Sequence, residues 1–136
     1  MALKKGYRKL LEEAYASVHT LSLAEAKAKH GDPDVVFVDI RDAREVERDG
    51  MIAGAVLAPP GMLEFSVDPE SPYYMEVFGS GKQLVLYCEG AWSSALAAKT
   101  LDEMGVPRVC HLEGGYAAWK ASGAPTVAVE PHQPKK

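Results

Sequence analysis

The sequence predicts an α/β fold in which a parallel β-sheet is flanked by helices on both faces. Two runs of β-branched and large apolar residues, 35–38 and 84–87, carry no polar face, and such strands lie in the middle of parallel sheets. Segments with helical periodicity flank both runs, as right-handed β-α-β crossovers require. A chain of 136 residues is long enough for one hydrophobic core and too short for two, so we expect a single domain.

The chain opens with an amphipathic segment. Apolar side chains recur at helical spacing over residues 3–14, with charged side chains on the other side. This pattern predicts that residues 1–17 form a helix packed on the domain. Ser22 and Glu25 form a capping box, so a second helix is expected from there to about residue 30.

Three further elements follow the second apolar run. An apolar stripe over 94–104 that stops at Gly105 predicts a helix, because Gly is favoured just past helix C-termini. Residues 108–112 are expected to form another strand. Residues 116–122 are expected to form a last short helix closed by Gly123.

These elements place the domain at residues 18–125. Residues 126–136 have little to bury, so we expect a flexible C-terminal tail. The segment 59–80 is rich in Met and aromatic residues. Three interpretations of it stay open: cover for the core, a wall at the mouth of a site, or a patch through which a homodimer forms.

Composition and charge exclude several classes of protein. The net charge is −4 and the basic residues are scattered, so no nucleic-acid partner is expected. No window is apolar enough for a membrane span, and the charges over residues 4–13 are incompatible with a signal peptide. Cys88 and Cys110 provide no disulfide framework, and no His has metal-ligand spacing with them. We therefore expect a cytoplasmic protein without a metal site.

Cys88 stands where a strand is expected to turn into a helix. Backbone N–H groups at a helix start lack intrahelical partners, and the helix dipole adds positive potential, so a thiolate or an anion is stabilised there. The alternative is a buried Cys that acts as a small hydrophobe. Residues 39–41 and 113–115 end two other expected strands, and ligands bind at this edge of parallel sheets. Their convergence favours a functional Cys88.

Four blocks of the sequence, taken in order, resemble those of a single-domain rhodanese. They are Val36–Arg41 with Glu45, Gly50–Ala55, Val85–Cys88 with a short loop into Ser94, and Leu112–Trp119. The resemblance covers roughly residues 20–123. It implies a five-stranded parallel sheet and a catalytic Cys88 that accepts a sulfane sulfur as a persulfide. The sulfur would come from a small sulfur-containing donor and pass to a thiol or to cyanide, without any cofactor.

The length of the loop after Cys88 separates two branches of this architecture. A phosphatase or arsenate reductase needs an Arg after five intervening residues to clamp an oxyanion, and Ser94 stands there, so phosphoryl chemistry is not expected. A shorter loop suits a sulfur atom, which backbone N–H groups would surround. This candidate substrate-binding loop consists of Glu89, Gly90, Ala91, Trp92, Ser93 and Ser94.

The loop departs from the common family pattern Cys-Arg-x-Gly-x-Arg-Ser. Glu89, Ala91 and Ser93 replace the first Arg, the Gly and the second Arg. Thiosulfate is therefore expected to be a poor donor, because no loop cation is left to attract it. The lost arginines also leave an alternative function open: a non-catalytic rhodanese-like module that binds a partner or senses oxidants through Cys88.

Five other side chains have narrower interpretations. Asp39 and Arg41 are expected to support the loop from beneath by pairing with the backbone or with each other. Cys110 is expected to be inert core. Met51 stands where the family usually has His and is interpreted as core or rim filler. Trp92 either lines the pocket and selects an acceptor or packs the loop on the domain.

Overall fold

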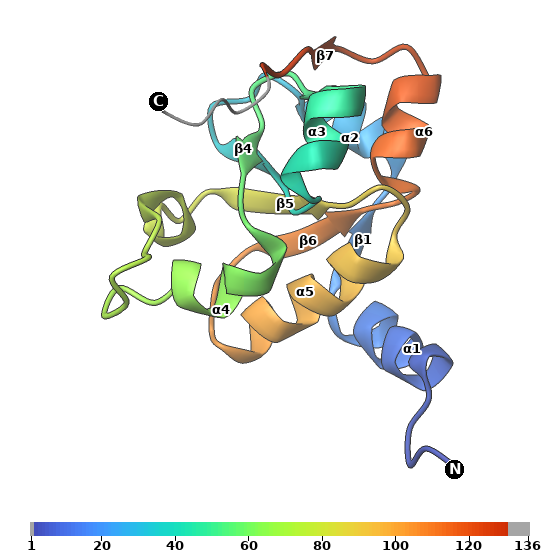
Figure 1. The fold of residues 1–136 in the computed structure, drawn as a ribbon, viewed down its shortest axis with the longest axis vertical. Helices are drawn as coiled ribbons and strands as arrows, with labels where there is room; N and C mark the ends of the chain where they lie inside the picture. Colours follow the sequence, from blue (N-terminus) through green and yellow to red (C-terminus); the bar gives the residue numbers. More distant parts are fainter. Residues whose placement is uncertain (1, 131–136) are drawn as a thin grey trace.

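The computed structural model describes residues 2–130, and its centre is a five-stranded sheet in which all neighbouring strands are parallel (Figure 1). In sheet order the strands are β1 (His19–Leu21), β6 (Val109–Leu112), β5 (Gln83–Tyr87), β2 (Val35–Asp39) and β4 (Val56–Leu57). The predicted α/β class and the five-stranded parallel sheet are confirmed. The two apolar runs form β2 and β5, which pair with each other near the middle of the sheet.

Helices cover both faces of the sheet. On one face lie α5 (Trp92–Glu103) and α4 (Leu63–Ser66). Ala98 and Leu101 of α5 and Leu63 of α4 pack against Val38 and Leu86 of the central strands. This burial explains why the central strands have no polar face on this side, since a polar side chain there would lose its water without gaining a partner.

On the other face lie α2 (Leu23–Lys29), α3 (Ala43–Asp49) and α6 (Gly115–Ala121) (Figure 1). Ala26 of α2 and Trp119 of α6 pack against Phe37 and Val85. Trp119 is fully buried, and its indole N–H donates to the Pro125 carbonyl at 2.9 Å. A buried Trp needs such a partner because its ring is apolar but its N–H is not.

Two helices, α2 and α3, begin at capping boxes. The Ser22 and Glu25 capping box that begins α2 is confirmed. A second box, in which Asp42 accepts from the first turn and Glu45 reaches back to the Asp42 N–H, begins α3. The sequence analysis did not assign α3, although Asp-x-x-Glu is the signal that would have found it.

The N-terminal helix α1 (Tyr7–Ser17) packs mainly on α5 and also meets the sheet, where the ring of Tyr15 lies 5.3 Å from that of His111 on β6. Leu11 and Ala14 of α1 lie against Ala95 of α5. The helix begins later than the apolar pattern indicated. Gly6 is its N-cap, and Leu3 is exposed.

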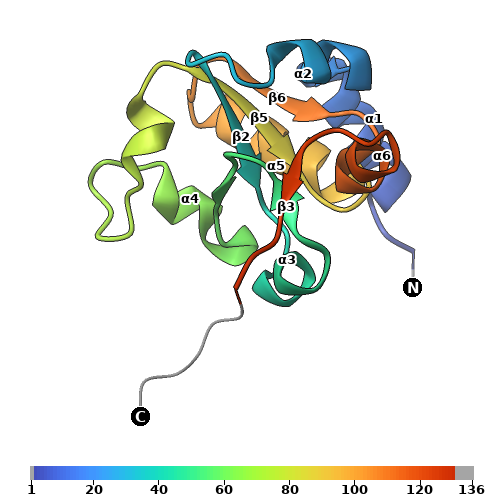
Figure 2. The ribbon, with the colours of Figure 1, turned by 90° about the horizontal axis from the view of Figure 1, so that it is seen from above.

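The C-terminal segment differs from the expected tail. Residues Thr126–Val127 form β7, which pairs antiparallel with β3 (Met51–Ile52), as Figure 2 shows. The sequence analysis placed 126 and 127 in the flexible tail because residues 126–136 have little to bury. A strand of two residues is too short to show a pattern of its own. Residues 131–136 of that predicted tail lie outside the described residues.

The segment 59–80 both covers the core and contributes to the wall of a pocket, which are two of the three interpretations given above. It contains the short helices η1 (Pro60–Met62), α4 and η2 (Glu76–Gly79). Phe78 is buried in the core, whereas Pro60 lines the pocket described below. A homodimer through this segment stays a prediction. Among the described residues, no helix is long and apolar enough to cross a membrane.

Candidate active site

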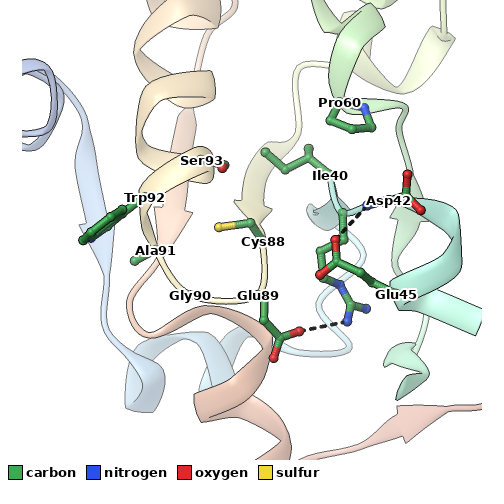
Figure 3. Close-up of a pocket in the computed structure, with 11 residues that line it drawn as sticks. Ile40, Asp42, Glu45, Pro60, Cys88, Glu89, Gly90, Ala91, Trp92 and Ser93 are labelled. Carbon is green, nitrogen blue, oxygen red and sulfur yellow. Dashed lines mark hydrogen bonds and ion pairs between the residues drawn. The ribbon is translucent and has the colours of Figure 1, made fainter. Parts of the chain in front are cut away.

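Cys88 directly follows β5, and α5 begins four residues later at Trp92. The thiol opens on a pocket of about 470 Å³ at the carboxyl edge of the sheet (Figure 3). The pocket is lined by Ile40, Arg41, Asp42, Glu45, Pro60, Cys88, Glu89, Gly90, Ala91, Trp92 and Ser93. The structure therefore brings the predicted nucleophile, Arg41 and all but one of the predicted loop residues to one cavity. Ser94 lies just behind it, fully buried.

The start of α6 holds the Cys88 loop from beneath. The Tyr116 N–H donates to the Cys88 carbonyl at 2.8 Å, and the Ala117 N–H donates to the Glu89 carbonyl at 3.0 Å. Gly115 makes this approach possible because a Cβ there would lie 1.8 Å from the Gly90 carbonyl oxygen. Gly115 also has a positive φ of 61°, which side-chain-bearing residues rarely adopt.

The backbone groups next to the thiol divide into carbonyls that have a partner and N–H groups that have none among the described residues. Two loop carbonyls are turned toward α6, and the N–H groups of residues 89–94 donate to no acceptor within the described part of the chain. These residues connect Cys88 to the N-terminal end of α5, a helix of 12 residues. Free N–H groups and the helix dipole both favour a negative charge on sulfur. The Cys88 Sγ lies 3.5 Å from the Ser94 Oγ, which gives the thiol a neutral hydrogen-bonding neighbour.

Asp39 and Arg41 form a buried ion pair beside the loop, as their position predicted. The Arg41 guanidinium donates to the Asp39 carboxylate at 2.7 Å and 3.1 Å and to the Gly50 carbonyl at 2.7 Å. It also stacks on the Tyr116 ring, 3.9 Å from the centroid. Burial alone would lower the pKa of Arg41, but the hydrogen bonds with Asp39 hold it above its ordinary value.

Arg41 reaches the loop itself through Glu89. Its remaining nitrogen, Nη1, lies 3.4 Å from Oε1 of Glu89 (Figure 3). The sequence analysis placed Glu89 in the loop but assigned it no partner. No sequence pattern links the two residues, because they follow different strands and meet only when β2 and β5 pair.

Trp92 forms part of the pocket mouth and is not buried. Its side chain is 59% exposed and lines the pocket. The ring lies 5.2 Å from that of Tyr7 at the start of α1, so the N-terminal helix reaches the site. The sequence analysis did not place Tyr7 at the site, and it did not predict that Asp42 and Glu45 line the pocket. All three residues lie at helix starts, which only the tertiary fold brings near Cys88.

Cys110 takes no part in this arrangement. It lies on β6, is buried, and is absent from the residues that line the pocket. Burial raises the pKa of the Cys110 thiol to about 11. Met51 is likewise buried, in β3. Within residues 2–130 there is no group of three or more His, Cys, Asp or Glu side chains that would hold a metal ion.

The fold and the pocket define a class of protein: an α/β domain whose site is built around one cysteine at the carboxyl edge of a parallel sheet. The family model of the Rhodanese-like domain matches residues 22–122. The chain therefore belongs to the rhodanese-like family, and the suspected resemblance is confirmed. Helix α1 lies outside the matched residues.

Three similar proteins differ in what their names say. A sulfurtransferase of Allochromatium vinosum is 34% identical over 97 residues, which cover 71% of this chain and 82% of that protein. An uncharacterised protein of Synechocystis is 37% identical over 93 residues, 68% of this chain, and this match spans only 47% of the relative. A solved structure from Rhodopseudomonas palustris is 48% identical to this chain and superposes with a TM-score of 0.90. The match covers 93% of this chain and 98% of that one. Its description says that the function is unknown and that the protein is a possible tyrosine phosphatase. The family and the A. vinosum relative support sulfur transfer at the level of the family.

Proposed function

We propose that this protein is a sulfurtransferase in which Cys88 accepts a sulfane sulfur as a persulfide and passes it to a thiol or to cyanide. One observation carries the proposal. The Cys88 thiol opens on a pocket, while the N–H groups of residues 89–94 have no acceptor among residues 2–130. Such donors are suited to hold the negative charge that a persulfide places on its outer sulfur.

The transfer takes place in two displacements at sulfur. The Cys88 thiolate attacks the outer sulfur of a donor R–S–SH, the S–S bond of the donor breaks, and R–S⁻ leaves with the bonding electron pair. The acceptor thiolate then attacks the outer sulfur of the Cys88 persulfide, and the Cys88 thiolate is regenerated as the leaving group. Neither step needs a metal or an organic cofactor.

Phosphoryl chemistry, the activity suggested in the description of the R. palustris structure, fits the pocket less well. A phosphate would need a cation to clamp its oxygens, and Ser94 occupies the position of the phosphatase Arg. Arg41 is the cation among the lining residues, and two carboxylates, Asp39 and Glu89, already neutralise it.

The proposal is tested by intact-mass measurement after exposure to thiosulfate and, separately, to an organic persulfide. We expect an increase of about 32 Da, one sulfur atom, that maps to Cys88 and is removed by a reductant. Cys88→Ser should lose both the adduct and sulfur transfer while remaining folded, and Cys110→Ser should keep both. An adduct that persists in Cys88→Ser would sink the proposal. A folded wild type that takes up no sulfur from either donor would favour the non-catalytic binding or redox-sensing module.

A further inference from the structure

We propose that the Cys88 pocket is built for an organic thiol or persulfide that carries an ammonium group, and that it discriminates against anionic sulfur compounds. The inference rests on the proposed function and names its substrate class. It is supported by the set of charged side chains that the fold brings to the pocket from different parts of the chain. Three carboxylates line the pocket against one guanidinium.

The guanidinium offers little to an anionic substrate. Arg41 is 3% exposed, and Asp39 holds two of its nitrogens. Its Nη1 is the nitrogen nearest the loop, and the Glu89 carboxylate stands in front of it at 3.4 Å. The Glu89 side chain is about half exposed, so its carboxylate faces both Arg41 and solvent. The one cation that lines the pocket is thus covered by a carboxylate on the side from which a ligand would approach.

The other two carboxylates are fixed at the rim by the capping box of α3. The Asp42 side chain accepts from the Arg44 N–H at 2.8 Å, and the Glu45 side chain accepts from the Asp42 N–H at 3.4 Å. Neither carboxylate forms an ion pair within residues 2–130. Arg48, one turn beyond Glu45, is itself paired with Asp49 at 3.0 Å. Arg48 also interacts electrostatically with Glu45, but neither rim carboxylate is held in an ion pair by a described residue, so both can attract a cationic ligand.

The two walls of the pocket suit different parts of such a substrate. In Figure 3, Cys88 lies between Trp92 and Ala91 on one side and Asp42 and Glu45 on the other. The free N–H groups of the loop stabilise a negative charge at the sulfur alone. An ammonium group two or three bonds from that sulfur would meet the carboxylates, and Ile40 and Pro60 would contact the carbons between them. A carboxylate or sulfonate in the same place would meet like charge.

Three acceptor thiols of similar size and different charge test this inference: cysteamine, 2-mercaptoethanol and 3-mercaptopropionate. Cys88 is loaded with excess inorganic polysulfide and desalted, and the loss of the added sulfur to each thiol is followed by intact mass in a single turnover. The measured quantity is the ratio of the cysteamine rate to the 3-mercaptopropionate rate. Comparing this ratio between variants cancels the intrinsic reactivities of the thiols.

The informative variants are Glu45→Gln and Glu89→Gln, singly and combined, because each removes a charge and keeps the shape. A unit charge about 6 Å away in a water-like medium changes a rate about threefold, with opposite sign for the two thiols. The ratio should therefore fall by about tenfold in each single variant and by up to about a hundredfold in the double variant. Glu103→Gln, at the far end of α5, is the matched control and should keep the wild-type ratio.

A second measurement uses the wild-type protein alone. Raising the salt from about 0.05 M to about 1 M should compress the ratio, because the Debye length falls to about 3 Å. A ratio that survives both high salt and the double substitution overturns the inference and leaves the proposed function standing. Failure of Cys88 to take up sulfur in the wild-type protein overturns the proposed function, and this inference with it.

Discussion

Replacing Gly115 by Ala should detach the Cys88 loop from α6. The substitution lies outside that loop, yet we expect it to impair the uptake of sulfur by Cys88. A Cβ at this position would lie 1.8 Å from the Gly90 carbonyl oxygen and 2.6 Å and 2.7 Å from those of Cys88 and Glu89. All three contacts are with backbone, so no flexible side chain can yield. The loop must move by more than an ångström to restore ordinary van der Waals separation.

The expected loss has two parts. An Ala forced to keep the left-handed φ of 61° costs about 1 kcal/mol. Withdrawal of the loop breaks the hydrogen bonds from Tyr116 and Ala117, each worth about 1 kcal/mol net, so the free energy of unfolding should fall by about 3 kcal/mol. Gly123→Ala is the matched control. Its φ is 79° and its Cβ would meet no atom within 4 Å, so it carries the conformational cost alone, about 1 kcal/mol.

Urea unfolding of the two variants measures this difference, and intact mass after exposure to an organic persulfide reports the site. Gly115→Ala should be the less stable variant and should load Cys88 more slowly than Gly123→Ala, because the loop that carries the unbonded N–H groups is displaced. Equal losses of stability in the two variants would refute the reasoning. So would wild-type loading in a Gly115→Ala protein.

Two further predictions concern buried titratable groups. Iodoacetamide at pH 8 should modify Cys88 and spare Cys110 in the folded protein, because burial raises the pKa of Cys110 to about 11 and keeps that thiol protonated; peptide mapping that finds Cys110 alkylated under native conditions would contradict this. His111 is fully buried, and burial lowers its pKa below the ordinary value of about 6.5. Because the unfolded chain binds the proton more readily, stability should fall as the pH drops through about 6.5, more steeply than in His111→Gln. Matching slopes of unfolding free energy against pH in the two proteins would argue against it.

Local sequence determined the elements that carry their own signal. The apolar runs of β2 and β5 and the capping box of α2 could be predicted because the cause lies within a few neighbouring residues. The position of Cys88 between a strand and a helix could be predicted for the same reason. The strands β1, β3, β4 and β7 could not, since two or three residues show no period and exist as strands only through their partners.

The surroundings of Cys88 were decided by the tertiary structure. The Glu-Gly-Gly block could be recognised from sequence, but only the contact of Gly115 with the loop carbonyls shows why a side chain is excluded there. The loss of the loop arginines was visible in the sequence, whereas the pairing of Glu89 with Arg41 was not. The physical reason is that the charge and shape of a pocket depend on distances between segments far apart in the chain. Those distances are set by strand order and helix packing, which no local pattern encodes.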